Sequence, residues 1–347
     1  MKKYNVVPYI SIFVFFFSCF AIVSTGRFGG DGVENYLTAK SIVLDGDIAI
    51  DNNYRDIKEI QDRAEGVQGR AGLHYSSFGI GMPILLIPLY VTGLLVSKCV
   101  PSVCPEHVTQ FFTSFTNPVL VALTAVALFY LLLKMRFGPA VSFATIICYG
   151  FSTMSLIYTR SGFSEPAIGL SLILAVLLIW RYEESGNVGN MAAVSILAGY
   201  AVLIKSNSLL YLPLLAGYVI YKSFKGGISS DKVRLWLAAF IPVAAFMLIY
   251  FYLRSIMNYG SDVEGVKIYN DIVARSMPQK PQFIKGIIYY LFSAGKGYFF
   301  YNLPLVLGLF ALHAERKERK QLHLFIMIIV LLNLFYYSAR FFRGSIF

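Results

Sequence analysis

Residues 7–40 read VPYISIFVFFFSCFAIVSTGRFGGDGVENYLTAK, and they join an apolar run directly to a glycine-rich turn that carries acids. The apolar part is about as long as a helix must be to cross a bilayer. Asp31 and Glu34 follow within a few residues of its end. The stretch therefore predicts a membrane span with two acids close to the membrane surface.

The whole chain has a composition that is unusual for a soluble protein. Of its 347 residues, 57% are hydrophobic and 14% are charged, whereas a soluble domain has about a quarter charged residues. We therefore expect an all-α polytopic membrane protein, with residues 1–347 forming a single transmembrane domain. The net charge of +11 comes without a basic domain or a zinc-type Cys/His spacing. It indicates cytoplasmic loops and contact with anionic lipid, and it does not indicate nucleic acid.

Nine membrane spans are expected from the apolar runs. The N-terminal run could be a signal peptide, but it is longer than the usual apolar core and no small-x-small site follows it. We expect it to be an uncleaved span, with Lys2 and Lys3 holding the N-terminus in the cytoplasm. The nine spans are placed at about 7–25, 110–133, 139–158, 166–181, 191–204, 208–221, 235–253, 298–312 and 322–338.

One further run, GIGMPILLIPLYVTGLLVSKCV from Gly79, is either a tenth span or a helix on the outer surface. If it spans, the three basic loops that begin at residues 134, 221 and 313 all lie outside the cell. If it lies at the surface, all three lie inside, as the positive-inside rule prefers. Pro83, Pro88 and three glycines also favour a broken, surface-lying helix. We therefore expect a juxtamembrane helix here.

On this topology the outer face collects the long loops 26–109 and 254–297 and a short turn, TRSGFSEP, around Arg160 and Glu165. Loops as long as these are usually functional in a compact protein. The expected location is the inner (plasma) membrane, with the active site on the outer face. Cys99 and Cys104 also lie on that face, where they could form a disulfide or remain as free thiols.

The two acids of the opening stretch have a purely local interpretation. Asp31 as an N-cap with Glu34 three residues later is a capping arrangement. A stripe of apolar residues follows at helical spacing, and Gly46 is a suitable C-terminal stop. Both acids could then simply begin a surface helix. The stripe consists of Val33, Tyr36, Leu37, Val43 and Leu44.

The same stretch resembles the first outer loop of the GT-C glycosyltransferases, especially the protein O-mannosyltransferases and the lipid A aminoarabinose transferases. The acid after the first span precedes a helix, YLTAKSIVLDGD, and then a proline-containing helix, YSSFGIGMPILLIPLY. YTRSGFSEP is similar to the second acidic turn of the family, and AVLIKSNSLLYLP to its basic residue between two spans. SAGKGYFFYNLPLVLGL is similar to the glycine-basic-glycine entry to a late span.

The resemblance implies a GT-C-like bundle and an inverting transfer of a hexose or pentose from a polyprenyl-phosphate donor. The acceptor is a lipid, glycan or protein at the outer face. An attacking hydroxyl must lose a proton, which a carboxylate can accept. Asp31 matches the base of the family, and Glu34 and Glu165 are the further catalytic candidates. No D-x-D pair indicates a divalent metal, and the metal requirement is left open.

The departing lipid phosphate is best stabilised by cations placed in a water-poor site. Arg160, Lys205 and Lys296 are the candidates that the resemblance implies. Arg160 could instead only snorkel from the end of a span, and Lys205 could only occupy the turn KSNS. Lys296 in AGKG lacks the spacing of a Walker loop. Glu165 has an alternative as well, because an acid before a proline is a good helix start.

Two other functions fit part of the sequence. A transporter or flippase for a lipid-linked saccharide should have ionisable residues in mid-span and repeated halves. Here the charges cluster at span ends and in outer loops, which favours a transferase. The chain ends with YYSARFFRGSIF, where relatives commonly continue into an outer loop and further spans. The C-terminus is therefore expected to be short relative to the family, and an inactive truncated relative is the other alternative.

Overall fold

The structure is a computed structural model in which the regular elements of the described residues are helices apart from one small hairpin. It describes residues 6–50, 67–68, 73–76, 78–160, 162–223, 230–257, 283–293 and 320–339. In the hairpin, β1 (Val67–Gln68) pairs antiparallel with β2 (His74–Tyr75). Two compact units are present, one formed by Met1–Ile146 with Ser155–Ser261 and the other by Ile147–Met154 with Asp262–Phe347.

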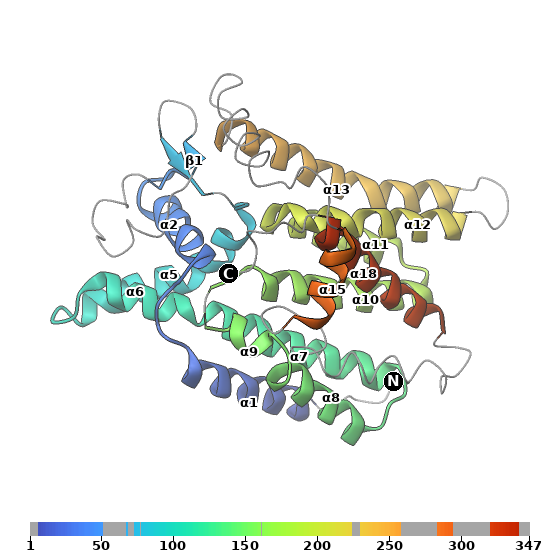
Figure 1. The fold of residues 1–347 in the computed structure, drawn as a ribbon, viewed down its shortest axis with the longest axis horizontal. Coiled ribbons are helices and arrows are strands. Elements are labelled where there is room, and N and C mark those ends of the chain that lie inside the picture. Colours follow the sequence, from blue (N-terminus) through green and yellow to red (C-terminus); the bar gives the residue numbers. More distant parts are fainter. Residues whose placement is uncertain are drawn as a thin grey trace. The chain divides into compact units, whose positions relative to one another are not determined.

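The helices follow the apolar runs of the sequence (Figure 1). The first part of the chain forms α1 (Val7–Val23), α2 (Asp31–Leu44), α5 (Gly81–Cys99), α6 (Pro105–Ser114), α7 (Thr116–Lys134), α8 (Pro139–Phe151) and α9 (Ser155–Tyr158). It continues with α10 (Glu165–Ser185), α11 (Val188–Ile204), the 3₁₀ helix η2 (Ser206–Tyr211), α12 (Leu212–Ser223) and α13 (Ser230–Met257). The second unit contains α15 (Phe283–Phe292) and α18 (Lys320–Ala339).

Four helical stretches of the described chain are long and apolar enough to cross a membrane. They are Gly81–Cys99, Pro105–Lys134, Glu165–Ser185 and Ser230–Leu253, and shorter apolar helices accompany them. The helical fold and the multi-pass membrane character agree with the composition. The expected span at 139–158 is divided, because α8 ends at Phe151 and α9 begins at Ser155. The expected span at 298–312 lies outside the described residues.

The run from Gly79 forms one continuous helix, α5, so the expectation of a broken helix is wrong. Pro83 lies in the first turn, where backbone N–H groups have no partner within the helix and a missing donor costs little. Pro88 lies inside the helix. The hydroxyl of Thr92 donates to the carbonyl of Pro88 at 2.9 Å. With 19 residues, α5 also has the length of a span.

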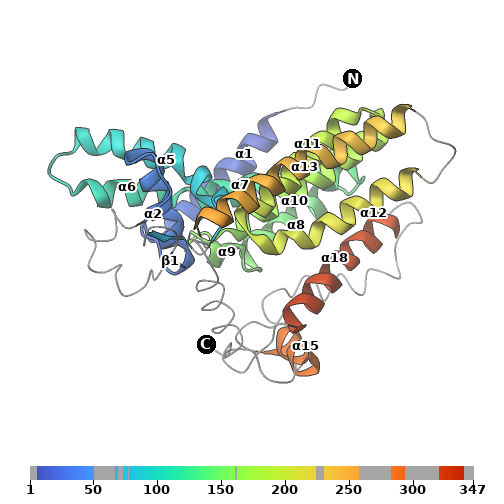
Figure 2. The ribbon, with the colours of Figure 1, turned by 90° about the horizontal axis from the view of Figure 1, so that it is seen from above.

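Helices α1 and α10 both pack along α7. The contact of α7 with α1 is aromatic. The ring of Tyr9 on α1 lies edge-on to Phe129 and Tyr130, with centroids 6.1 Å apart in both pairs. Near the other end of α1, Phe17 meets Phe115, the residue between α6 and α7. Figure 2 shows α1 and α7 side by side from a second direction.

Helices α10 to α13 share a second core, formed by residues that include Met191 and Leu215. At Pro242 the helix α13 loses a backbone donor. The next amide, of Val243, donates to the hydroxyl of Ser195 on α11 at 3.0 Å. A Cβ at Gly199 would lie 2.7 Å from Phe246, so glycine allows α11 and α13 to approach closely at this level.

Helix α2 packs on α5 through the apolar stripe that the sequence predicts. Val33, Tyr36 and Leu37 are buried against Tyr90 of α5, and Val43 packs beside them. Leu44, the last member of the stripe, is half exposed. Gly46 has a φ of 73° and its N–H bonds back to the carbonyl of Ser41, which confirms it as the stop.

Two buried polar contacts fix α2 to α6. The hydroxyl of Tyr36 lies 2.8 Å from that of Thr109, and the ammonium of Lys40 lies 3.0 Å from a carboxylate oxygen of Glu106. Burial, and after it the Glu106 carboxylate, raises the pKa of Tyr36 far above its usual range, so the phenol stays protonated. These contacts hold the helix that begins with Asp31 in one orientation.

The N-cap of α2 lies one residue before the position that the local interpretation of the two acids predicts. Gly30, with a φ of 53°, occupies the N-cap position of α2, and no side chain caps the helix. Asp31 is therefore the first helical residue, and the expectation that it is the N-cap is wrong. Because L-residues other than glycine rarely adopt a positive φ, the tight turn places the glycine at the cap. An acid in the first turn still interacts favourably with the helix dipole.

Helix α5 is seated on the end of α11 through two glycines. A Cβ at Gly81 would lie 2.6 Å from the backbone nitrogen of Ile204, and one at Gly79 would clash with the carbonyl oxygen of Leu203. The hydroxyl of Tyr200 donates to the carbonyl of Gly81 at 2.7 Å. The segment before α5 is thus pressed against the last residues of α11.

In the second unit, α15 and α18 pack against each other. Phe283 at the start of α15 meets Phe335 of α18, with ring centroids 5.0 Å apart. Gly286 is the buried residue of α15. The two helices therefore form a pair with an aromatic contact between them.

Candidate functional site

The loop between α1 and α2 lies against the turn between α9 and α10. The hydroxyl of Thr25 donates to the carbonyl of Arg160 at 3.3 Å. A Cβ at Gly162 would clash with the ring of Phe28 and would lie 3.3 Å from the Cα of Gly32. The two predicted acidic segments, far apart in the sequence, are therefore neighbours in the fold.

A buried asparagine holds the turn between α9 and α10 in shape. Asn117, at the start of α7, donates from its amide nitrogen to the carbonyls of Tyr158 at 2.8 Å and Phe163 at 3.0 Å. The rings of Tyr158 and Phe163 also meet edge to face. Helix α10 begins at Glu165 immediately after this turn, with Pro166 in its first turn as the sequence predicts.

Glu165 and Lys205 form an ion pair. The ammonium of Lys205 lies 2.7 Å from Oε1 of Glu165. Lys205 ends α11 with extended backbone, just before η2, which points its side chain back toward the start of α10. The second oxygen of Glu165, Oε2, is buried and has no hydrogen-bond partner among the described residues. Glu165 and Lys205, which the sequence analysis named as separate candidates, therefore form one ion pair.

Glu34 extends this polar region along α2. Its side chain is 9% exposed and accepts a hydrogen bond from the hydroxyl of Ser76 at 3.2 Å. The same hydroxyl accepts the backbone N–H of Phe78 at 3.1 Å. The ammonium of Lys205 lies 5.9 Å from the centre of the Phe78 ring, in cation–π range. Glu34 and Lys205 therefore approach the segment before α5 from different helices.

A cavity of about 320 Å³ opens between the two acidic segments. It is lined by Thr25, Arg27, Phe28, Gly29, Ile157 and Arg160. Both arginines are exposed. Their guanidinium groups have no hydrogen-bond or ion-pair partner in the part of the chain that the structure describes. Two cations with free donors beside a cavity can receive an anion such as a phosphate.

The structure places the predicted site residues that it describes in two groups. Arg160 lines the cavity, and Asp31 begins α2 two residues after Gly29. Glu34, Glu165 and Lys205 belong to the adjoining polar region. The side chain of Asp31 and all of Lys296 lie outside the described residues.

Sequence reasoning missed Arg27, although the residue lies within the opening stretch. The only signal was an arginine next to glycines, directly after a span. Such a residue is equally expected to snorkel at the membrane surface. Its role as a cavity wall depends on the approach of the turn at Arg160.

No group of three or more His, Cys, Asp or Glu within the described ranges is placed to hold a metal ion. All four cysteines are free thiols, and Cys99 and Cys104 are both exposed. Comparisons with protein-family models, curated proteins and solved structures find no match to this chain.

The Lys205–Glu165 pair can be tested by a double-mutant cycle on thermal unfolding in detergent. Lys205→Met and Glu165→Gln should each destabilise, and the double variant should recover part of the loss. We expect a coupling of about 1–2 kcal/mol, since a hydrogen bond to a charged group contributes roughly 1.5–3 kcal/mol and both side chains are partly exposed. Lys134 and Glu184, whose carboxylate is 50% exposed, form the control pair, with a coupling below about 1 kcal/mol. Strictly additive effects at Lys205 and Glu165 would contradict the pairing.

Proposed function

We propose that this chain is a GT-C-type membrane glycosyltransferase that moves a sugar from a polyprenyl-phosphate carrier to an acceptor. The observation that supports this most is the cavity where Arg27 and Arg160 meet. Its volume is within the range of small-molecule sites. Helix α2, which begins with Asp31, starts beside this cavity. A phosphate would find two guanidinium groups there.

The proposed reaction is a direct displacement at the anomeric carbon of the sugar. The acceptor oxygen attacks this carbon, and its proton passes to the carboxylate of Asp31, the general base. The bond between the anomeric carbon and the phosphate oxygen breaks, and its electron pair leaves on the polyprenyl phosphate. Attack from the face opposite the phosphate inverts the configuration. Arg27 and Arg160 stabilise the negative charge that develops on the departing phosphate.

The other predicted residues act around this centre. Glu165 orients Lys205, because its carboxylate already accepts from the ammonium at 2.7 Å. Lys205 then adds positive charge at the neighbouring end of α11. Glu34 holds the segment before α5 through Ser76. Lys296 remains a proposed phosphate contact from a later part of the chain.

The proposal includes the nine-span topology, in which α5 lies at the outer surface although it has the length of a span, with the N-terminus in the cytoplasm and the cavity on the outer face. Cys99 and Cys104, at the turn from α5 to α6, then face outward. In intact cells an impermeant maleimide should label these two exposed thiols in a Cys19→Ser, Cys148→Ser background. In a chain without other cysteines, Lys134→Cys should react only after permeabilisation. Labelling at 134 in intact cells would overturn this topology.

The base assignment can be tested by Asp31→Asn, which removes the proton acceptor and preserves size. We expect the rate of transfer to fall by about 10²–10⁴-fold, with unchanged expression and unfolding temperature. The assay uses membranes with a panel of polyprenyl-phosphate sugars and measures both the glycosylated product and the released polyprenyl phosphate. Asp45→Asn, at the other end of the same helix, is the matched control and should keep full activity.

Two outcomes of this assay would count against the proposal. Full activity of Asp31→Asn on the true donor would remove Asp31 as the base while leaving the transferase function in place. If the wild-type chain moves the intact lipid-linked sugar across the membrane without releasing polyprenyl phosphate, it is a flippase.

The two arginines of the cavity can be tested by single substitutions. Arg27→Ala and Arg160→Ala should each lower the transfer rate by about 10²–10³-fold, in analogy with the loss of one oxyanion donor. Arg→Lys at either position should recover part of the rate, because the charge is kept and the bidentate geometry is lost. Arg234→Ala is the control, since Arg234 is exposed at the start of α13. Unchanged rates in both cavity variants would exclude phosphate stabilisation by this pair.

A further inference from the structure

A second concave site of about 390 Å³ lies on the surface formed by α1, α7 and α10. On α10 its wall consists of Leu170, Leu174, Leu177 and Arg181, a spacing that follows one face of the helix. The wall on α7 and α1 is apolar and aromatic, formed by Leu123, Val126, Ala127, Tyr130 and Tyr9. The site is therefore an apolar groove that ends at a single charged residue, Arg181.

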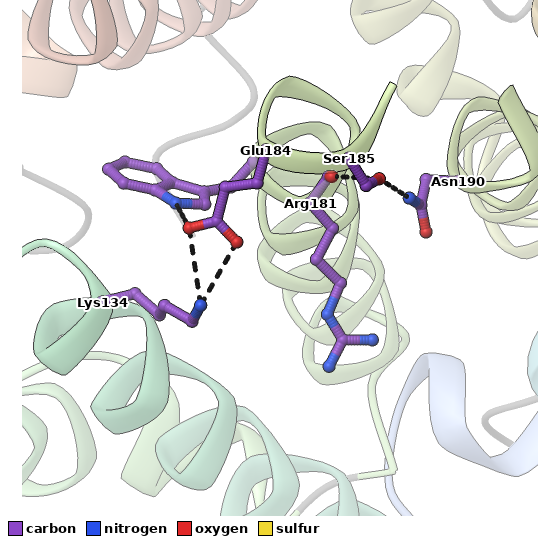
Figure 3. Close-up of polar contacts among 6 residues, drawn as sticks. Lys134, Arg181, Glu184, Ser185 and Asn190 are labelled. Carbon is purple, nitrogen blue, oxygen red and sulfur yellow. Dashed lines mark hydrogen bonds and ion pairs between the residues drawn. The ribbon is translucent and has the colours of Figure 1, made fainter. Parts of the chain in front are cut away.

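The carboxylates near that end are already paired with other groups. Glu184 accepts from Lys134 at 3.2 Å and from the indole N–H of Trp180 at 2.9 Å (Figure 3). Glu183 pairs with Lys222. Figure 3 shows the guanidinium of Arg181 pointing away from Glu184, with no bond drawn to it. The backbone carbonyl of Arg181 accepts from the hydroxyl of Ser185 at 2.7 Å, whereas its guanidinium has no hydrogen-bond or ion-pair partner among the residues that the structure describes.

We propose that this groove binds one membrane phospholipid of net negative charge. An acyl chain lies along α7 and α10 between the leucines, and the phosphate group is bound by the guanidinium of Arg181. Basic pockets between membrane helices commonly bind anionic lipid head groups. The planar guanidinium also matches phosphate oxygens in a bidentate geometry. This site is separate from the cavity at Arg27 and Arg160 and does not depend on the proposed transferase activity.

The shape and the charge of the groove together select this occupant. An apolar helix of a partner protein would fill the groove, but it would give Arg181 no anion. A free phosphate ion would bind the guanidinium, but it would leave the apolar walls without an occupant. A neutral phospholipid would offer the same chain with no net negative charge. An anionic phospholipid satisfies both the leucine walls and the unpaired cation.

The experiment compares two lipids with identical acyl chains, phosphatidylglycerol and phosphatidylcholine, added to the purified full chain in neutral detergent. Native mass spectrometry counts the lipids retained, and the unfolding temperature is titrated against lipid concentration. We expect one phosphatidylglycerol to be retained and to stabilise the chain, with a weaker response to phosphatidylcholine. Arg181→Gln should weaken the apparent affinity for phosphatidylglycerol roughly fivefold, the effect of about 1 kcal/mol per basic residue near a membrane surface.

Two controls separate this site from general effects. Arg136→Gln removes an exposed arginine just after α7 that does not line the groove, and it should leave the affinity unchanged. Leu174→Trp fills the groove and should reduce the binding of phosphatidylglycerol although Arg181 is intact. If Leu174→Trp does not fold, the result for Arg181→Gln alone decides the outcome. Equal responses to the two lipids, an equal loss in Arg136→Gln, or the same stabilisation by inorganic phosphate would each overturn the proposal.

Discussion

The approach of the segment before α5 to the end of α11 is the contact on which the polar region around Lys205 depends. Side chains at Gly79 and Gly81 would collide with the backbone of Leu203 and Ile204, so only glycine permits it. Lys205 directly follows Ile204 in the chain. As a result, the ring of Phe78 lies beside the ammonium of Lys205. The same contact brings Ser76 to Glu34 on α2 and so connects α2 to the end of α11.

Four lysines and four arginines of the first unit have different environments, whereas Arg234 pairs with Asp231. Lys40, Lys134, Lys205 and Lys222 each form an ion pair with a glutamate. In the described ranges, Arg27, Arg136, Arg160 and Arg181 form none. A lysine pair fixes two helices at a point, whereas an arginine left unpaired keeps a planar set of donors for a carboxylate or phosphate. The proposals for both sites rest on this second group.

The helices were predictable from the sequence because their signals are local. The length of each apolar run, the stripe on α2 and the stop at Gly46 all involve residues within a few positions of one another. The N-cap of α2 was misplaced by one residue, since Asp is a preferred N-cap residue and nothing local shows that the cap falls on Gly30 instead of Asp31. The sequence analysis took Pro83 and Pro88 as signs of a broken helix and so did not predict that α5 is continuous. Proline is nevertheless tolerated in the first turn and within apolar helices.

The site was predictable only as a set of separate residues. Arg160, Glu165, Lys205 and Glu34 were all named from the sequence, but no pattern shows that Lys205 pairs with Glu165. That pairing joins the ends of two helices 40 positions apart in the chain. Arg27 was missed for the same reason. Its value as a candidate comes from the turn at Arg160, which only the fold brings to it.

The two proposed anion sites lie near opposite ends of α10, and this links the questions of topology and function. The cavity lies at the start of α10, and Arg181 lies near its end. A helix of 21 residues is about 31 Å long, close to the thickness of the hydrocarbon core of a bilayer. If α10 spans, the two sites face opposite leaflets. Anionic lipids are concentrated in the cytoplasmic leaflet, so a lipid at Arg181 places the cavity outside, the same side that the positive-inside rule gives it.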